Sequence, residues 1–271
     1  MPKQNTSSEF STLKNVNDFV QFLRTREKEH KYYYHYTRLS TLNTILESNS
    51  FRFTHGIHPN LNDQHEIYKK SSIQGHEKNY IFCLTHDCDE SVAMWALYTQ
   101  LRDDAIRIQI PCDKIHQWIK NQPHIYPKVS LGNSLKIPAN DYDLFLSDIA
   151  YCRITEDGEQ LEWLWDNTQT KEQFSFNFDQ DKLLAGLIKN TAWKFEQETR
   201  IIIQFKKSQD CQSDYLYAQL SQELIKSLKI FKSPWFNDHK HEQDLDDLLR
   251  ESNILTPPSQ SRLKGKISLK Q

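Results

Sequence analysis

The chain has unusually little glycine. Six of its 271 residues are glycine, whereas an average usage of about 7% would give about 19. They lie at positions 56, 75, 132, 158, 186 and 265, so no two are close enough to form GxGxxG, a Walker A loop or GxSxG. These absences exclude glycine-cradled phosphate sites and the nucleophile elbow of hydrolases. A nucleotide bound to this chain must therefore be held by side chains.

The cysteines and histidines lack the spacings of disulfide frameworks and metal sites. The five cysteines are odd in number and include no CxxC pair, which favours reduced thiols. Two groups resemble metal clusters, one of Cys83, His86 and Cys88 and one of three histidines at 55, 58 and 65. Neither has the spacing of a tetrahedral site. The sequence therefore predicts no metal.

The sequence also lacks a membrane signal and an excess of charge. Its first fifteen residues, MPKQNTSSEFSTLKN, contain no apolar run, and no stretch approaches the ~20 apolar residues of a membrane span. Acidic residues number 36 and basic residues 34, so the net charge of −2 gives no overall attraction to nucleic acid or anionic lipid. We expect a cytoplasmic protein with no membrane partner.

Large aromatic side chains supply much of the apolar material. Aromatic residues make up 12% of the chain and apolar residues 37%, which is enough for one sizeable core. We expect a polar segment and a helix over residues 1–30, and a single domain over 31–271. Prolines between 121 and 147 predict an insertion there.

Hydrophobic periodicity predicts an α+β fold with a mainly antiparallel sheet. Strands are expected at 32–37, 51–54, 80–85, 106–110, 148–152 and 199–205, and helices at 40–49, 114–120 and over 159–190. Connections between strands are short, helices are interspersed, and no regular βαβ repeat is visible.

Two glutamates beside the Ile-rich strand are the first candidate for chemistry. If that strand begins near residue 195, then Glu196, Glu198 and Arg200 share one face, about 7 Å apart in succession. One carboxylate could contact a ribose hydroxyl and the other could orient an acceptor. The alternative is an ion-pair ladder at a solvated sheet edge, where such pairs contribute little stability.

Polar residues at two other strand ends are the second candidate. His35 and Tyr36 end the aromatic strand and could hydrogen-bond to and stack on a nucleotide, although an aromatic core strand is the simpler interpretation. Thr85 ends the strand expected at 80–85 and could line a cleft. Asp63 and Glu66 read as a capping box.

The motifs together resemble a known family. They are Tyr33-Tyr34-His35-Tyr36-Thr37, Asn62-Asp63-x-x-Glu66, Phe82-Cys83-Leu84-Thr85, Met94-Trp95-x-x-Tyr98 and Trp193-x-x-Glu196-x-Glu198-x-Arg200. In this order and spacing they are similar to a large bacterial family of domains of unknown function. That family in turn resembles, more distantly, the mono-ADP-ribosyltransferase superfamily. Of the fourth motif, Trp95 and Tyr98 are expected simply as core.

The resemblance implies a split sheet whose cleft binds NAD as a substrate. His35, Tyr36 and Thr85 would then hold NAD, together with Arg200, and Glu198 would be the catalytic carboxylate that contacts the ribose. Glu196 would assist an acceptor, which could be a protein or a nucleic acid. A role as a toxin or phage-defence effector would follow.

Two other functions remain open from the sequence. One is a nucleic-acid-processing enzyme on the same scaffold, whose phosphate contacts would come from the lysine pairs at 69–70 and 206–207. The other is a catalytically inert sensor or binding module that keeps the cleft. Nicotinamide release from NAD would favour the transferase over both.

Overall fold

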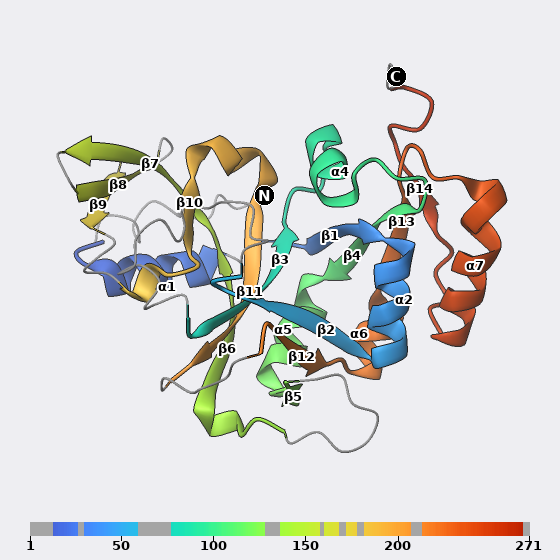
Figure 1. Cartoon of the computed structure of the whole chain (residues 1–271), viewed down its shortest axis with the longest axis horizontal. Helices are drawn as coiled ribbons and strands as arrows, with labels where there is room; N and C mark the ends of the chain where they lie inside the picture. Colours follow the sequence, from blue (N-terminus) through green and yellow to red (C-terminus); the bar gives the residue numbers. More distant parts are fainter. Residues whose placement is uncertain are drawn as a thin grey trace, which may run out of the picture.

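The chain folds into a mixed α+β structure built on two sheets (Figure 1). The computed structural model describes residues 13–26, 30–58, 77–127, 136–157, 160–167, 172–177, 182–206 and 213–267. Within these residues there is a ten-stranded sheet and a four-stranded sheet. Pairing there is antiparallel except between β10 and β7 and between β13 and β14.

The strands fall into two groups. The ten-stranded sheet contains β1 (Tyr32–Arg38), β2 (Ser50–His55), β3 (Asn79–Thr85), β4 (Ala105–Pro111), β5 (Ile125–Tyr126), β6 (Tyr142–Asp148), β11 (Glu198–Phe205), β12 (Tyr215–Gln219), β13 (Lys229–Lys232) and β14 (Ser259–Gln260). The four-stranded sheet contains β7 (Ala150–Asp157), β8 (Gln160–Asn167), β9 (Glu172–Asn177) and β10 (Ile188–Asn190).

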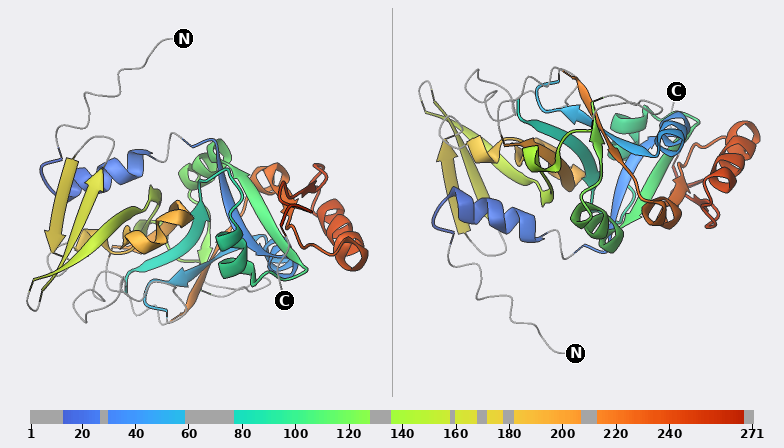
Figure 2. Two further views of the ribbon diagram at one scale, coloured as in Figure 1. Left: turned by 90° about the horizontal axis from the view of Figure 1, so that it is seen from above. Right: turned by 90° about the horizontal axis from the view of Figure 1, so that it is seen from below.

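The helices are short and pack on these sheets. They are α1 (Val16–Arg26), α2 (Leu39–Ser48), α4 (Val92–Thr99), α5 (Cys112–Lys120), α6 (Gln222–Ser227) and α7 (Asp238–Glu251), with 3-10 turns η3 (Ala139–Asp141), η4 (Lys182–Leu184) and η5 (Thr191–Glu196). None of the described helices has the length and apolar character needed to cross a membrane. Figure 2 places α1 and the four-stranded sheet at one end of the molecule and α7 at the other.

The large sheet splits beside β3. One edge of β3 pairs with β11 along its whole length, from Thr85 opposite Glu198 to Asn79 opposite Gln204. The other edge is shared, because β1 meets β3 at Thr85 and β2 meets it near Ile81. The two branches then diverge, β1 toward β4 and β13, β2 toward β12 and β5. The predicted antiparallel α+β architecture is present, and the split opens a gap in the sheet.

Strand β11 is buried on both faces, which explains its continuous apolar run. Ile201 and Ile203 belong to the main core, whereas Ile202 belongs to a second core beneath α1. Side chains alternate along a strand, so successive isoleucines face opposite cores. With β3 on one side and β6 on the other, β11 is a central strand. The interpretation of Glu198 and Arg200 as a solvated edge ladder is therefore wrong.

The predicted helix over 159–190 is wrong. That stretch forms β8, β9, η4 and β10. A period-two pattern was partly present in the sequence, because Glu162 separates Leu161 from Trp163 and Ser175 separates Phe174 from Phe176, although Leu164 interrupts it before Trp165.

The stretch 121–147 does more than form an insertion. Its C-terminal part is most of β6, which pairs along the length of β11. The predicted strand 148–152 is interrupted at Ile149, where the chain passes from the large sheet into the small one. The prolines of this stretch lie before β6, whereas residues 142–148 belong to the large sheet. Helix α1, Val16–Arg26, is the helix expected within residues 1–30, and it packs on the four-stranded sheet through Phe19 and Trp165.

Candidate active site

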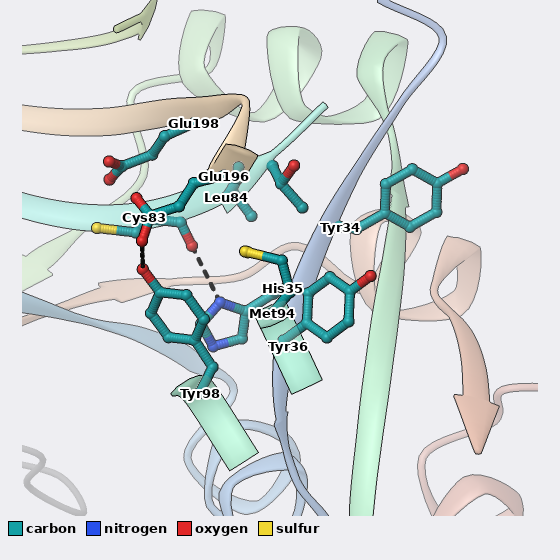
Figure 3. A pocket seen from close by; sticks show the side chains of 10 residues that line it. Tyr34, His35, Tyr36, Cys83, Leu84, Met94, Tyr98, Glu196 and Glu198 are labelled. Carbon is teal, nitrogen blue, oxygen red and sulfur yellow. Dashed lines mark hydrogen bonds between the residues drawn. The ribbon is translucent and has the colours of Figure 1, made fainter. Parts of the chain in front are cut away.

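A pocket lies where β1 leaves β3. Its empty space of about 310 Å³ includes space open to solvent, and Figure 3 shows the residues around it. Its lining comes from β1, β3, α4, η5 and the start of β11: Tyr34, His35, Tyr36, Cys83, Leu84, Thr85, Met94, Tyr98, Glu196 and Glu198. Five residues singled out from the sequence therefore line one pocket, although they are separated by up to about 160 positions along the chain.

Glu198 is a buried carboxylate held by two cations. It is 3% exposed, and Arg200 donates to it through Nε at 2.7 Å and Nη2 at 3.1 Å. Lys189 Nζ donates to its Oε2 at 3.1 Å. Burial alone would raise the pKa of Glu198, but Arg200 and Lys189 outweigh it and lower the pKa to about 2. The carboxylate is therefore ionised throughout the neutral range.

Glu196 has the opposite tendency. It is 1% exposed, accepts a hydrogen bond from Tyr98 Oη at 2.6 Å and one from Lys189 Nζ at 2.6 Å. Burial and the neighbouring charge of Glu198 raise its pKa, and the attraction of Lys189 only partly offsets them. The pocket thus holds two carboxylates, Glu198 with a lowered pKa and Glu196 with a raised pKa.

The local backbone brings Glu196 beside Glu198 by a turn, not by strand alternation. Residues 191–196 form the 3-10 turn η5, and β11 begins at Glu198. Between them Gln197 adopts the left-handed conformation, with φ 44° and ψ 53°. The expected row of carboxylates along one strand face is therefore wrong. Both carboxylates nevertheless reach the same ammonium group, that of Lys189.

Lys189 was not recognised from the sequence. It sits in the middle of β10, pairs in register with Tyr151 of β7, and is 3% exposed. Its ammonium lies 4.9 Å from the ring centroid of Trp193. Burying a lysine is costly unless it is paired, so a lysine directly after an apolar run, as in Leu187-Ile188-Lys189, was the signal that could have found it.

Tyr98 was expected in the core but faces the pocket. Its hydroxyl contacts Glu196, as Figure 3 shows. Burial, together with the charges of Glu198 and Glu196, raises the pKa of this phenol well above its ordinary value. Tyr98 therefore acts as a permanent hydrogen-bond donor. By contrast, Trp95 lies in the core as predicted, at 0% exposed and with its ring 4.7 Å from that of Tyr36.

His35 occupies the split itself. Strand alternation places it on the face opposite Tyr34 and Tyr36, and its ring stacks on Phe82 at 4.7 Å. It still lines the pocket because β1 and β3 separate there. Its Nδ1 lies 3.0 Å from the carbonyl oxygen of Cys83. A carbonyl only accepts, so Nδ1 carries the proton and Nε2 carries the lone pair. Burial lowers the pKa of His35 and keeps the ring neutral.

The hydroxyl group of Tyr36 points away from the carboxylates. It accepts hydrogen bonds from Ser91 N at 3.3 Å and Arg107 Nη1 at 3.4 Å. The buried Arg107 also lies 4.4 Å from the ring centroid of Tyr34. Figure 3 shows both phenol hydroxyls on the far side of the pocket from Glu198. The tyrosines therefore offer ring faces and edges to a ligand, and the hydroxyl of Tyr36 is taken up by contacts to Ser91 and Arg107.

Thr85, Cys83 and Arg200 complete the surroundings of Glu198. Thr85 lines the pocket opposite Glu198 in register, and its Oγ1 accepts from Asp87 N at 3.1 Å. Burial and the charge of Glu198 raise the pKa of the Cys83 thiol, which therefore stays protonated. Arg200 differs from its expected place, because it lies behind Glu198 and donates from Nη1 to Gly186 O at 2.9 Å. It orients the carboxylate and is not among the residues that line the pocket.

Several sequence candidates lie outside the described residues. They are Asp63 and Glu66 of the predicted capping box and three of the lysines considered for phosphate contacts, Lys69, Lys70 and Lys207. The fourth, Lys206, is about half exposed and pairs with Asp143 at 3.3 Å. Of the five cysteines, four lie in the described residues and all four are free thiols, as expected.

Comparison with known proteins yields a weak structural likeness. No family model matches the chain, and no curated protein matches it. Neither comparison therefore supports the motif resemblance to a bacterial family. Two solved structures are similar, "Thermus sp. 2.9 DarT in complex with ADP-ribosylated ssDNA" at 10% identity and TM-score 0.33, and the same protein "in complex with NAD+" at 9% and 0.32. They cover 87% and 86% of this chain and 95% of theirs. Scores this low leave function to be argued from the residues of this chain.

Proposed function

We propose that the chain is an NAD-consuming enzyme that transfers ADP-ribose to an acceptor. The observation that carries the proposal is the pair of buried carboxylates, Glu196 and Glu198, whose pKa values are shifted in opposite directions in one pocket. Carboxylates with separated proton affinities are typical of sites that divide charge stabilisation from proton transfer.

The two carboxylates would take different parts in the reaction. The glycosidic bond between the ribose carbon and nicotinamide breaks, and its electron pair leaves with the nicotinamide. Positive charge then develops on the sugar, and the permanently ionised Glu198 stabilises it. A nucleophilic oxygen or nitrogen of the acceptor forms the new bond and loses its proton to Glu196. With water as the acceptor NAD is hydrolysed, and this reaction depends less on Glu196 because water can also release its proton to solvent.

The other wall of the pocket fits a planar ligand that carries hydroxyls. Tyr34 and Tyr36 offer aromatic surface from β1, and His35 offers the lone pair of Nε2. Thr85 lies at the end of β3, across from Glu198. This arrangement would hold the nicotinamide ribose through side chains, which is consistent with the absence of glycine-rich phosphate loops.

A matched pair of variants tests the proposal. Purified protein is incubated with NAD, and released nicotinamide is quantified for the wild type, Glu198→Gln and Glu196→Gln, after unfolding curves establish that each is folded. We expect Glu198→Gln to lose turnover by a factor of at least about 100, the scale of one electrostatic contact to a transition state. Glu196→Gln should impair transfer more than hydrolysis.

The same experiment separates the other two functions. Wild-type turnover equal to that of Glu198→Gln would contradict the proposal. No turnover with water, protein or nucleic acid as acceptor would favour the inert module, in which the carboxylates and their cations are a structural ion network. Nucleic-acid processing without NAD finds no support in Lys206, which is already paired with Asp143.

A further inference from the structure

A second cluster of polar side chains lies on the other side of β11 from the carboxylates. Asp148 ends β6 and pairs in register with Thr199, the residue between Glu198 and Arg200. Because side chains alternate, Thr199 and Asp148 face away from the pocket. His86 follows Thr85 at the end of β3, and His30 precedes β1. Four segments of the chain therefore meet at this end of the sheet.

The donor atoms of this cluster converge closely. His30 Nε2 lies 2.9 and 3.2 Å from the two carboxylate oxygens of Asp148. His86 Nδ1 lies 3.7 Å from Asp148 Oδ1. Among the described residues, one donor atom from each of the three side chains can be chosen so that all lie within 4.8 Å of one another. We propose that His30, His86 and Asp148 bind a divalent transition-metal ion, with zinc as the best fit.

The distances fit the size of such an ion. With metal–ligand distances of 2.0–2.1 Å in a tetrahedral site, two donors lie about 3.4 Å apart. The separations of Asp148 Oδ1 from the two imidazole nitrogens, 3.2 and 3.7 Å, bracket that value. Two imidazoles and one carboxylate form a nitrogen and oxygen donor set that suits zinc and its first-row neighbours. Three protein ligands leave a fourth position for water.

The surroundings meet two further requirements of a metal site. Thr199 Oγ1 donates to Asp148 Oδ1 at 2.7 Å, an outer hydrogen bond of the kind that orients a ligating carboxylate. Asp148 is 2% exposed, whereas each histidine is 17% exposed, so an ion reaches the cluster from the histidine side. His30 also lines an open groove beside α5.

Binding requires one adjustment of the side chains. The two imidazole rings are stacked, with centroids 4.0 Å apart and planes 8° apart. Nitrogen lone pairs lie in the ring planes, so parallel rings cannot both point at one ion. One or both rings must tilt, and His86 Nδ1 must exchange its 3.0 Å contact with Thr199 Oγ1 for the metal. The exposed edges of the rings leave room for this movement.

The consequence would be a clamp at the base of the pocket. His86 follows the end of β3, Asp148 ends β6, and His30 lies two residues before β1. Strand β11 lies between β3 and β6. A bound ion would fix the strand ends that carry Thr85 and Glu198. The inference does not rest on the proposed reaction, because it concerns the opposite face of β11.

Titration with Zn²⁺ and Co²⁺ tests this site without any activity. Calorimetry of the full chain should give one ion per chain, and bound Co²⁺ should show the visible absorption of a site with nitrogen ligands. His86→Gln and Asp148→Asn should each weaken binding at least about 100-fold. The matched control is His241→Gln, because His241 also pairs with a carboxylate, Asp103 at 3.4 Å, but without a second histidine beside it among the described residues. It should change affinity less than threefold.

Two results would overturn the inference. One is wild-type binding weaker than millimolar for both ions. The other is binding that survives both His86→Gln and Asp148→Asn with less than a threefold change, which would place the ion elsewhere on the chain. Because either ligand variant could lower stability, circular dichroism checks that each is folded. A rise in melting temperature on adding Zn²⁺, present in the wild type and absent in folded Asp148→Asn, gives an independent readout.

Discussion

Lys189 is the residue on which the two carboxylates depend. It contacts Glu196 at 2.6 Å and Glu198 at 3.1 Å, and its positive charge lowers the pKa of both. Glu196 is also faced by Tyr98 and by the negative charge of Glu198. Without the ammonium group, repulsion between the carboxylates would raise the pKa of Glu196 further. The role of Glu196 as proton acceptor is thus tied to a side chain on another sheet.

We therefore predict that Lys189→Met shifts the acid limb of NAD turnover to higher pH. Proton transfer to Glu196 needs its ionised form, so a raised pKa moves the loss of activity upward. Lys189→Arg, which keeps the charge, should shift the limb less. The measurement is nicotinamide release across the pH range, with the carboxyl carbon of Glu196 followed by NMR as a readout that needs no turnover.

The chain supplies a matched control in Lys232. This lysine is also 3% exposed and bridges two carboxylates, those of Asp238 at 2.9 Å and Glu242 at 2.7 Å. Lys189→Met breaks a buried pair, which costs on the order of 3–5 kcal/mol, whereas the carboxylates that face Lys232 are partly exposed, Asp238 at 29% and Glu242 at 54%, so Lys232→Met should cost less. Lys232→Met should therefore lower stability and leave the pH profile unmoved. Equal pH profiles for the two methionine variants would refute the assignment to Lys189.

Helix α4 forms one wall of the pocket, and Trp95 is its largest buried side chain. The helix begins after Ser91, whose hydroxyl accepts from Met94 N at 3.3 Å, and ends at Gln100 in the left-handed conformation. On its inner face Trp95 packs against Tyr36 of β1. On its outer face Leu97 is 46% exposed. The inner contact holds Tyr98 toward Glu196.

Trp95→Ala should destabilise the protein by about 3–5 kcal/mol, because it leaves a large cavity under the helix. Leu97→Ala, on the exposed face of the same helix, should change stability by no more than about 0.5 kcal/mol. Urea unfolding of the three proteins measures both values. Similar stabilities for Trp95→Ala and wild type, together with loss of NAD binding, would instead make Trp95 part of the ligand site.

At the scale of the whole molecule, the buried charges link stability to pH. Glu198 has a folded pKa of about 2 against an ordinary value of 4.5. A lowered pKa stabilises the fold above the unfolded value, and that stabilisation is lost as the pH falls from about 4.5 toward 2. For one such carboxylate the loss is on the order of 3 kcal/mol. Glu196 has a raised pKa, so its contribution to the unfolding free energy has the opposite sign. Its ionised form destabilises the fold, and this cost falls as the group is protonated at lower pH.

We expect the unfolding free energy of the wild type to fall more steeply between pH 5 and 3 than that of Glu198→Gln. The glutamine cannot titrate, so the variant lacks this share of the pH dependence while starting from a lower stability at neutral pH. Denaturant unfolding at several pH values gives the two curves. Parallel curves would mean that the pKa of Glu198 is not lowered in the folded protein.

The sequence by itself determined the local elements that have strong periodicity. Alternation of apolar and polar residues predicted β4, and the run of aromatic residues predicted β1. The Ile-rich run predicted β11 as a central strand. It also pointed to the residues that line the pocket, because polar side chains at the ends of apolar strands need a partner.

The tertiary structure alone decided how those residues act. Pairing of β3 with β11 on one edge and with two diverging strands on the other created the split that holds His35. The turn at Gln197 and the parallel pairing of β10 with β7 brought Lys189 between the glutamates. The cluster of His30, His86 and Asp148 likewise joins segments more than fifty residues apart. Proton affinities and donor clusters arise from burial and distances across the sheet, and a linear sequence contains neither.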